Sequence, residues 1–362
     1  MVSSPTKIAK SAKRKTGILG VHPLLAAVAA MALMFAGAVF GGWLNMAKRE
    51  QAVVQVAKVA PPAAVAKPRT APPSFSPPVI ANMDELDTEP PAIAGPPPPP
   101  NLAEQVAKAQ ASPPLANPLQ AFALPFSAPA NRAIIAIVID DMGLDRVHSQ
   151  RAVELPGPIT LSFLTYANNL STWAVLARNA GHEVLAHIPM EPLDPKENPG
   201  PKALTLALSE AEIKDRFAAM LDPWSGYVGV NNHMGSRFTA DTAHMTTIMT
   251  MVKARGLLWL DSKTAGNSAG PALARAMGVP MLERDVFIDN VQTEDEVFQE
   301  LAHAEQVALQ RGSAIAIGHP HDVTLESLRI WMTTLPAKGI SLAPISEIYR
   351  RQAAATQQRA ER

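Results

Sequence analysis

The chain has 362 residues, a formal net charge of zero and no cysteine. The zero net charge gives no electrostatic reason to expect a nucleic-acid partner, because nucleic-acid-binding proteins are commonly basic. The absence of cysteine excludes disulfide bonds and any metal site with thiolate ligands.

The N-terminal 44 residues have the pattern of a membrane anchor. Residues 1–23 contain five basic and no acidic side chains, and Leu24–Leu44 is a stretch of 21 residues without a charge. Such a stretch is about long enough to cross a bilayer core of roughly 30 Å. We therefore expect a basic cytoplasmic head at 1–23 and a single-pass transmembrane helix at 24–44 in the inner membrane, with the rest of the chain in the periplasm. The alternative is a cleaved signal peptide and a secreted protein.

A Pro- and Ala-rich segment follows the predicted anchor. Of the 34 prolines, 19 lie between Gln51 and Ala130, and Pro96–Pro100 is a run of five. A segment of this composition buries too little apolar surface to offset its ordering entropy. We expect residues 45–132 to be a disordered, extended linker, with Asn101–Gln110 compatible with a short helix. A docking segment for a partner is the alternative interpretation.

From Ala133 onward, apolar runs typical of buried parallel strands alternate with amphipathic helix patterns. Seven or eight such units in one domain predict an α/β barrel over residues 133–350, followed by a polar tail at 351–362. Ser209 with Glu212 predicts a capping box at one helix start. The expected strands are Ala133–Asp140, Ile159–Leu164, Glu183–Ile188, Tyr227–Asn232, Leu257–Asp261, Val286–Asp289, Ser313–Gly318 and Ile340–Ala343. The expected helices are Ser171–Ala180, Ser209–Leu221, Asp241–Arg255, Gly270–Met277, Glu294–Arg311 and Thr324–Leu335.

Carboxylates and histidines gather where these strands end, which is the edge that carries the active site in parallel α/β barrels. Asp140 and Asp141 follow one apolar run, and paired carboxylates at a strand end favour a bound cation or a shared proton. The alternative is that one of them caps the next helix. His187, His233 and His319 follow other strands; each is a candidate metal ligand or catalytic group, and His187 alone is also compatible with a buried core histidine.

Further polar residues at the same edge are candidate substrate-binding groups. For Asp261, Arg284, Asp285 and Asp289, the alternative to lining a substrate groove is a surface ion-pair network. The candidates are Glu191, Asn231, Asn232, Asp261, Arg284, Asp285, Asp289 and His321.

Six segments, taken in order, resemble the divergent polysaccharide deacetylase family, whose relatives are metal-dependent carbohydrate esterases. The resemblance covers about Ile134 to Ile348 and implies a distorted (β/α) barrel of seven or eight strands with a divalent metal, usually zinc, near the strand ends. The segments are IAIVIDDMG, GHEVLAHIPMEP, VGVNNHMGSRFT, LDSKT, RDVFIDN and AIGHPH.

The resemblance also implies roles for individual residues. Asp140 matches the family's general base, Asp141 its metal-binding carboxylate, and His319 the histidine that protonates the leaving group. His187 matches the first histidine ligand. The better-known esterases have a second histidine four residues later, where this chain has Glu191. We expect His233 to replace it, with Glu191 as the second option.

The expected function is therefore metal-dependent removal of acyl groups, such as acetyl, from a glycan of the cell envelope or outside the cell. Two alternatives stay open at this point. One is a non-catalytic envelope protein that binds a glycan or another partner and has a degenerate site. The other is a metal-dependent hydrolase of a different ester or of a phosphate; the chain has no Gly-rich phosphate loop that would favour the latter.

Overall fold

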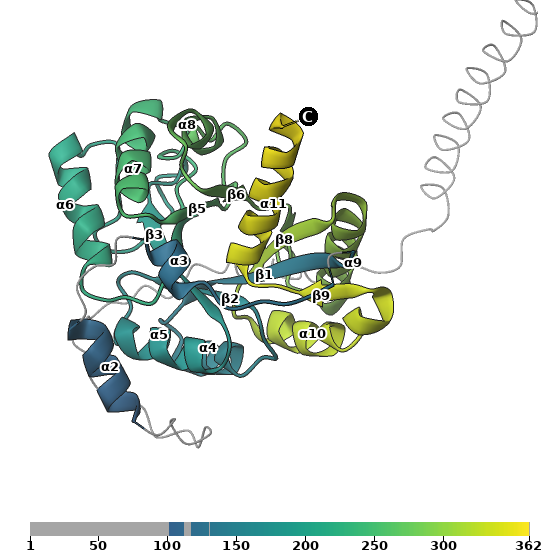
Figure 1. The fold of residues 1–362 in the computed structure, drawn as a ribbon. Coiled ribbons are helices and arrows are strands. Elements are labelled where there is room, and N and C mark those ends of the chain that lie inside the picture. Colours follow the sequence, from purple (N-terminus) through teal and green to yellow (C-terminus); the bar gives the residue numbers. More distant parts are fainter. Residues whose placement is uncertain (1–100, 112–116, 130, 362) are drawn as a thin grey trace, which may run out of the picture. The chain divides into compact units, whose positions relative to one another are not determined.

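The computed structural model describes residues 101–111, 117–129 and 131–361 (Figure 1). The predicted basic head, the predicted anchor and the linker up to residue 100 lie outside the described residues. Among the residues that are described, no helix is both long and apolar enough to cross a bilayer.

A curled parallel sheet forms the centre of the domain. The strand order is β6-β5-β4-β3-β2-β1-β8-β7, and β9 pairs with β1. The parallel α/β prediction is confirmed, but the barrel is open, because in the part of the chain that is described β6 and β7 are edge strands that do not pair with each other. The strands are β1 (Ala133–Met142), β2 (Thr160–Leu164), β3 (Glu183–Met190), β4 (Gly229–Met234), β5 (Leu258–Asp261), β6 (Met281–Glu283), β7 (Val286–Phe287), β8 (Ser313–Gly318) and β9 (Ile340–Leu342).

Helices connect the strands and surround the sheet (Figure 1). The predicted capping box is present in α6, where Ser209 accepts a hydrogen bond from the backbone N–H of Glu212 and the Glu212 side chain returns one to Ser209. The helices are α2 (Leu102–Ala111), α3 (Pro118–Phe122), α4 (Arg146–Val153), α5 (Leu170–Asn179), α6 (Glu210–Leu221), α7 (Thr242–Ala254), α8 (Gly270–Met277), α9 (Glu294–Arg311), α10 (Asp322–Met332) and α11 (Ile345–Ala360), with a 3₁₀ turn at Leu335–Lys338.

Alternation along the strands decides which side chains reach the inside of the curled sheet. On β1, Ile135, Ile137 and Ile139 belong to the large apolar cluster that includes the surrounding helices. Ile134 and Val138 belong to a separate cluster of inner-face residues. Because successive side chains of a strand point to opposite faces, the residue after Ile139 is placed on the inner face.

The same alternation applies to the neighbouring strands. Leu185 on β3 and Ile317 on β8 are both inner-face residues. Two positions further along these strands stand His187 and His319, which the period of two therefore directs to the inner face. The strand pattern thus brings side chains from three separate strands to one place at the carboxyl edge of the sheet.

Two helices close the opposite edge, where the strands begin. Leu119 of α3 and Ile345 and Ile348 of α11 pack with the inner-face residues. The carboxylate of Glu183, the first residue of β3, accepts hydrogen bonds from the backbone N–H groups of Leu124 and Ser346. The edge where the strands begin is thus covered by these contacts, and the polar cluster lies at the other, carboxyl edge.

The folded region is therefore longer than the predicted range 133–350. Residues 101–111 contain α2, where the sequence was compatible with a short helix; residues 117–129 of the predicted disordered linker contain α3, and α11 continues through most of the predicted polar tail. Asn117 caps α3 by accepting a hydrogen bond from the backbone N–H of Gln120, and Leu119 is buried against the domain. Burial of a few apolar side chains thus orders the last part of the Pro-rich segment.

Gly229 allows β4 and β5 to approach each other closely. A Cβ atom at this position would lie 2.4 Å from the backbone oxygen of Leu258. We expect Gly229→Ala to lower the free energy of unfolding by about 1–3 kcal/mol, the cost typical of overpacking. Denaturant titration measures this, with Gly266→Ala as the control, because a Cβ at Gly266 meets nothing within 4 Å. Equal stability of the two variants would contradict the prediction.

Candidate active site

The end of β1 carries a bulge that contains Asp140 and Asp141. Ile139 pairs with Leu161 and Met142 pairs with Phe163, so β1 has one more residue than β2 between these two pairs. Asp141 adopts a left-handed backbone conformation with φ of 57°. A bulge locally redirects side chains, and strained backbone of this kind is concentrated at functional sites. Both carboxylates are thereby brought to the inner face at the end of the strand.

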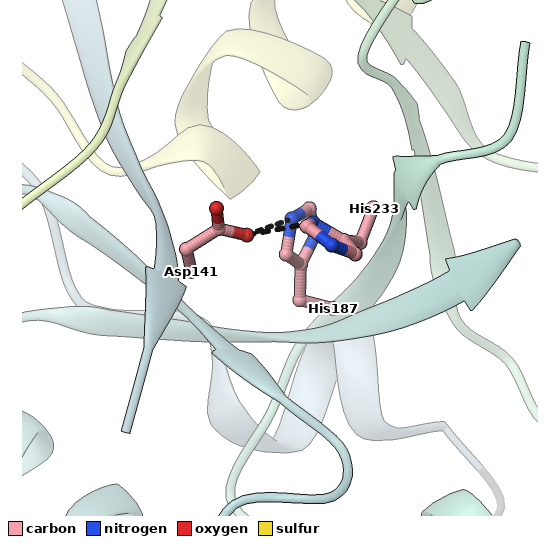
Figure 2. Close-up of side chains that lie close together, drawn as sticks. All are labelled: Asp141, His187 and His233. Carbon is pink, nitrogen blue, oxygen red and sulfur yellow. Dashed lines mark ion pairs between the residues drawn. The ribbon is translucent and has the colours of Figure 1, made fainter. Parts of the chain in front are cut away.

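Asp141 lies against His187 of β3 and His233 of β4 (Figure 2). Its Oδ1 atom is 2.7 Å from Nδ1 of His233 and 3.2 Å from Nε2 of His187. The candidate ligand atoms of the three residues all lie within 4.8 Å of one another. Burial alone would raise the pKa of Asp141, but the charges of His233 and His187 and the close approach of their ring nitrogens hold this pKa well below its ordinary value.

The geometry of this cluster fits a divalent cation. Asp141 Oδ1 is buried, and among the described residues it accepts no hydrogen bond of normal geometry despite the two nearby nitrogens. The three donor atoms therefore converge on one region without pairing well with one another. One carboxylate and two imidazoles are a ligand set that zinc uses in catalytic sites, with further positions left for water or substrate.

Asn231 connects the cluster to the strands around it. Its Oδ1 atom lies 2.8 Å from Nδ1 of His187 and accepts a hydrogen bond from Ser162. Its Nδ2 group donates to Oδ1 of Asp140 (2.8 Å) and to Ser262. Burial lowers the pKa of His187, but the charge of Asp140 and the contacts with Asp141 and Asn231 raise it overall.

His319, the residue that follows β8, faces the cluster. Its Nε2 atom is 3.8 Å from Oδ2 of Asp141, and its Nδ1 atom is 3.0 Å from Oδ1 of Asp289. Asp289 is held in place by the backbone N–H of His319 and by the hydroxyl of Thr324. Burial lowers the pKa of His319, but the hydrogen bond with Asp289 and the charges of Asp141 and Asp289 outweigh it and raise the pKa to about 9. At neutral pH this imidazole is a proton donor.

His321 lies beside this pair, at the start of α10. Its candidate ligand atom lies within 4.8 Å of those of Asp289 and His319. Its Nε2 atom is 2.9 Å from the side-chain nitrogen of Gln292. The oxygens of Asp289 already accept several hydrogen bonds, so this second group matches a metal site less well than the cluster around Asp141.

The structure places Glu191 away from the two histidines. One carboxylate oxygen accepts a hydrogen bond from the backbone N–H of Leu206 (2.6 Å), and the other lies 3.4 Å from Arg237. Glu191 thus holds the segment that follows β3. Of the two residues considered for the third ligand, the structure brings His233 to Asp141 and His187.

Asn232 and Arg284 support the loop after β5. Asn232 accepts a hydrogen bond from the backbone N–H of Ser262 and donates one to Thr264. The guanidinium of Arg284 donates to the backbone oxygens of Ser262 and Lys263.

Asp261 and Asp285 have local partners as well. Asp261 accepts hydrogen bonds from Lys263 N–H and the Ser268 hydroxyl. Asp285 accepts from Ile315 N–H and lies 3.1 Å from Arg311. Ile315 precedes His319 by four residues, about 13 Å along an extended strand. Asp285 is therefore remote from the cluster around Asp141.

Tyr166 is a site residue that the sequence prediction missed. It follows β2, and burial followed by the negative charge of Asp141 raises its pKa to about 12. Its hydroxyl therefore keeps its proton at neutral pH. The signal was present, because Thr165-Tyr166 follows the apolar run of β2 in the same way that Asp140-Asp141 follows the apolar run of β1.

A model of the divergent polysaccharide deacetylase family matches residues 137–349, more than half of the chain. The chain belongs to the divergent polysaccharide deacetylase family. The resemblance seen in the sequence is thereby confirmed, and with it the deacetylase-like fold. The matched range contains every residue of the cluster around Asp141.

Two uncharacterised proteins match most of the folded domain in sequence. YibQ, an uncharacterised protein of Escherichia coli K12, is 34% identical over 213 residues, which are 59% of this chain and 66% of YibQ. An uncharacterised protein of Haemophilus influenzae is 33% identical over 219 residues, 60% of this chain and 77% of its own length. The match thus spans just under two thirds of the length of YibQ.

A solved structure has the same fold. The crystal structure of an uncharacterised protein from Agrobacterium tumefaciens C58 is 31% identical to this chain, with a TM-score of 0.62. The likeness covers 64% of this chain and 95% of the other. The curled parallel sheet is therefore shared with a relative of similar sequence.

Proposed function

We propose that this protein is a metal-dependent hydrolase that removes acetyl groups from a glycan. The observation that carries the proposal is the convergence of Asp141, His187 and His233, with Asp140 next to them and His319 opposite. Membership of the divergent polysaccharide deacetylase family supports the acyl glycan as the substrate class.

Asp141, His187 and His233 would hold the divalent cation, and zinc is the metal that this ligand set favours. A bound cation of this kind lowers the pKa of water and polarises a carbonyl group. The three side chains come from three different strands, so the rigid sheet fixes their relative positions. The site is thereby pre-formed before substrate arrives.

Asp140 is the proposed general base. One of its oxygens is engaged by the side-chain amide of Asn231, and the other lies 3.7 Å from Nε2 of His187. That second oxygen is directed toward the cluster and can accept a proton from water held there. Asp140 is almost fully buried, with 3% of its surface exposed, so its position is set by the protein and not by solvent.

His319 is the proposed general acid, and Tyr166 is a proposed hydrogen-bond donor to substrate. The hydrogen bond with Asp289 favours the protonated imidazole of His319 by raising its pKa, and its Nε2 atom faces Asp141. A proton at Nε2 can pass to the leaving nitrogen or oxygen of the glycan. Asp289 holds the other ring nitrogen and so orients the imidazole.

Acetate release tests the proposal. Purified full-length protein is incubated with N-acetylated and O-acetylated glycans, as isolated, after chelation, and after chelation followed by addition of Zn²⁺. We expect acetate release that chelation removes and Zn²⁺ restores. Undiminished release after chelation would refute the metal dependence. Glycan binding without any acetate release by the Zn²⁺-loaded protein would favour the binding-protein alternative.

A further inference from the structure

Asn231 has no exposed surface, and all of its hydrogen-bonding positions are occupied. Its oxygen is within 2.6 Å of the Ser162 hydroxyl and 2.8 Å of His187 Nδ1. Its nitrogen is within 2.8 Å of Asp140 Oδ1 and 3.1 Å of the Ser262 hydroxyl. An asparagine amide has two acceptor and two donor positions, so this side chain has none left for a substrate.

The partners of Asn231 fix the direction of its amide group. An ionised carboxylate only accepts hydrogen bonds, so Asp140 requires the NH₂ end of the amide. The oxygen end then faces His187, and an amide oxygen only accepts. Nδ1 of His187 must therefore carry a hydrogen atom. The neutral imidazole consequently keeps its lone pair on Nε2, the atom that lies 3.2 Å from Asp141 Oδ1.

We propose that Asn231 is a positioning residue that selects the Nδ1–H tautomer of His187 and thereby makes Nε2 the ligand atom for the cation. The inference rests on the proposed metal site and replaces the earlier expectation that Asn231 binds substrate. It also ties the base to the metal ligand, because one amide group bonds to both Asp140 and His187. Fixing a ligating histidine through its second ring nitrogen is a general means of orienting metal ligands.

Asn232 provides a natural comparison. It is the next residue on β4, and it is equally buried, with no exposed surface. Its amide bonds to the backbone oxygen of Met234, to Thr264 and to the backbone N–H of Ser262. No hydrogen bond joins it to Asp140, Asp141 or the two histidines within the described part of the chain. Loss of Asn232 therefore removes buried hydrogen bonds without freeing the tautomer of His187.

The tautomer itself is measurable in the wild-type protein, and a variant is needed only to assign the signal. Full-length protein with ¹⁵N-labelled histidine is freed of metal and studied by long-range ¹H–¹⁵N correlation spectroscopy at a pH where His187 is neutral. His187→Gln identifies the signal. We expect hydrogen on Nδ1 and a lone pair on Nε2. Hydrogen on Nε2 instead would overturn the inference.

Metal affinity provides the second readout. Calorimetric titration with Zn²⁺ should show an affinity about 10- to 100-fold lower for Asn231→Ala than for wild type, the range typical when the partner of a ligating histidine is lost. Asn231→Asp keeps an oxygen that accepts from Nδ1, so we expect it to recover part of the affinity. Asn232→Ala is the control, with a change of at most a few-fold.

The outcomes separate this inference from the proposed function. If wild-type protein binds no divalent cation, the proposed metal site is wrong, whatever the tautomer. If wild type binds Zn²⁺ but Asn231→Ala binds it as tightly, the metal site stands and the role of Asn231 is wrong. Equal losses for Asn231→Ala and Asn232→Ala would also overturn the inference, because they would indicate a general loss of structure.

Discussion

Replacing Asp141 with Asn is expected to remove most of the protein's affinity for Zn²⁺, together with its acetate release. An amide oxygen carries no charge, so the two histidines would be the remaining strong ligands. The loss should exceed the roughly 10- to 100-fold expected for residues that only support a ligand. Asp141 is the residue whose oxygen lies close to both His187 and His233, whereas Asp140 is 3.7 Å from His187 and, among the described residues, has no ion pair with His233.

Calorimetric titration with Zn²⁺ measures this effect, and circular dichroism shows whether the variant is folded. Asp295→Asn is a suitable control, because Asp295 is an exposed residue in the first turn of α9. Wild-type affinity in Asp141→Asn would contradict the assignment of the metal site. Loss of affinity in the control would show that the measurement reports general damage.

Replacing Asp140 with Asn is expected to lower acetate release but to leave the affinity for Zn²⁺ largely unchanged. The amide keeps an oxygen that can accept the hydrogen bond from Asn231, so the fold and the metal site should be retained. It cannot take up a proton, however, and removal of a general base costs about 10²- to 10⁴-fold in rate. We therefore expect acetate release to fall by that factor while the affinity for Zn²⁺ changes by less than about tenfold.

The two neighbouring carboxylates thus form a matched pair of variants. Initial rates of acetate release at saturating Zn²⁺ separate a loss of the base from a loss of the metal. If Asp140→Asn released acetate at the wild-type rate, Asp140 would not be the base. If it lost Zn²⁺ as completely as Asp141→Asn, the two roles would have been assigned wrongly.

Much of the fold could be predicted because strands and helices of a parallel α/β domain have distinct apolar patterns. Ser313–Gly318 and the helices Gly270–Met277 and Glu294–Arg311 have the predicted bounds. The long apolar runs identified the central strands, which are covered on both faces. The apolar run that ends at Ile139 also placed Asp140 correctly at the carboxyl edge.

Other features depend on contacts between distant segments and leave little trace in local sequence. β6 has three residues, too few to show a period, and was not predicted; β7 has two residues and was predicted as the longer strand Val286–Asp289. The opening of the barrel between them could not be predicted for the same reason. α3 lies in a Pro-rich stretch, and its order comes from burying Leu119 against the inner-face residues.

The candidate site was predicted from the types of residue at the strand ends, and the structure brings together Asp140, Asp141, His187, His233 and His319. The sequence could not predict the strand register or the hydrogen bonds between distant segments. The bulge in β1 depends on its register with β2, and the hydrogen bonds of Asn231 depend on four other strands or loops. Glu191 lies on the same strand edge but turns to the following segment, which spacing alone does not reveal. The inner-membrane anchor at 24–44 stays a prediction, since it lies outside the described residues.

The central claim is that Asp141, His187 and His233 together bind the catalytic metal. The most direct test is anomalous diffraction from crystals of the Zn²⁺-loaded protein, recorded at the zinc edge. The structure predicts an anomalous peak within coordination distance of a carboxylate oxygen of Asp141, Nε2 of His187 and Nδ1 of His233. A peak held instead by Asp289, His319 and His321, or no ordered peak in the domain, would contradict it.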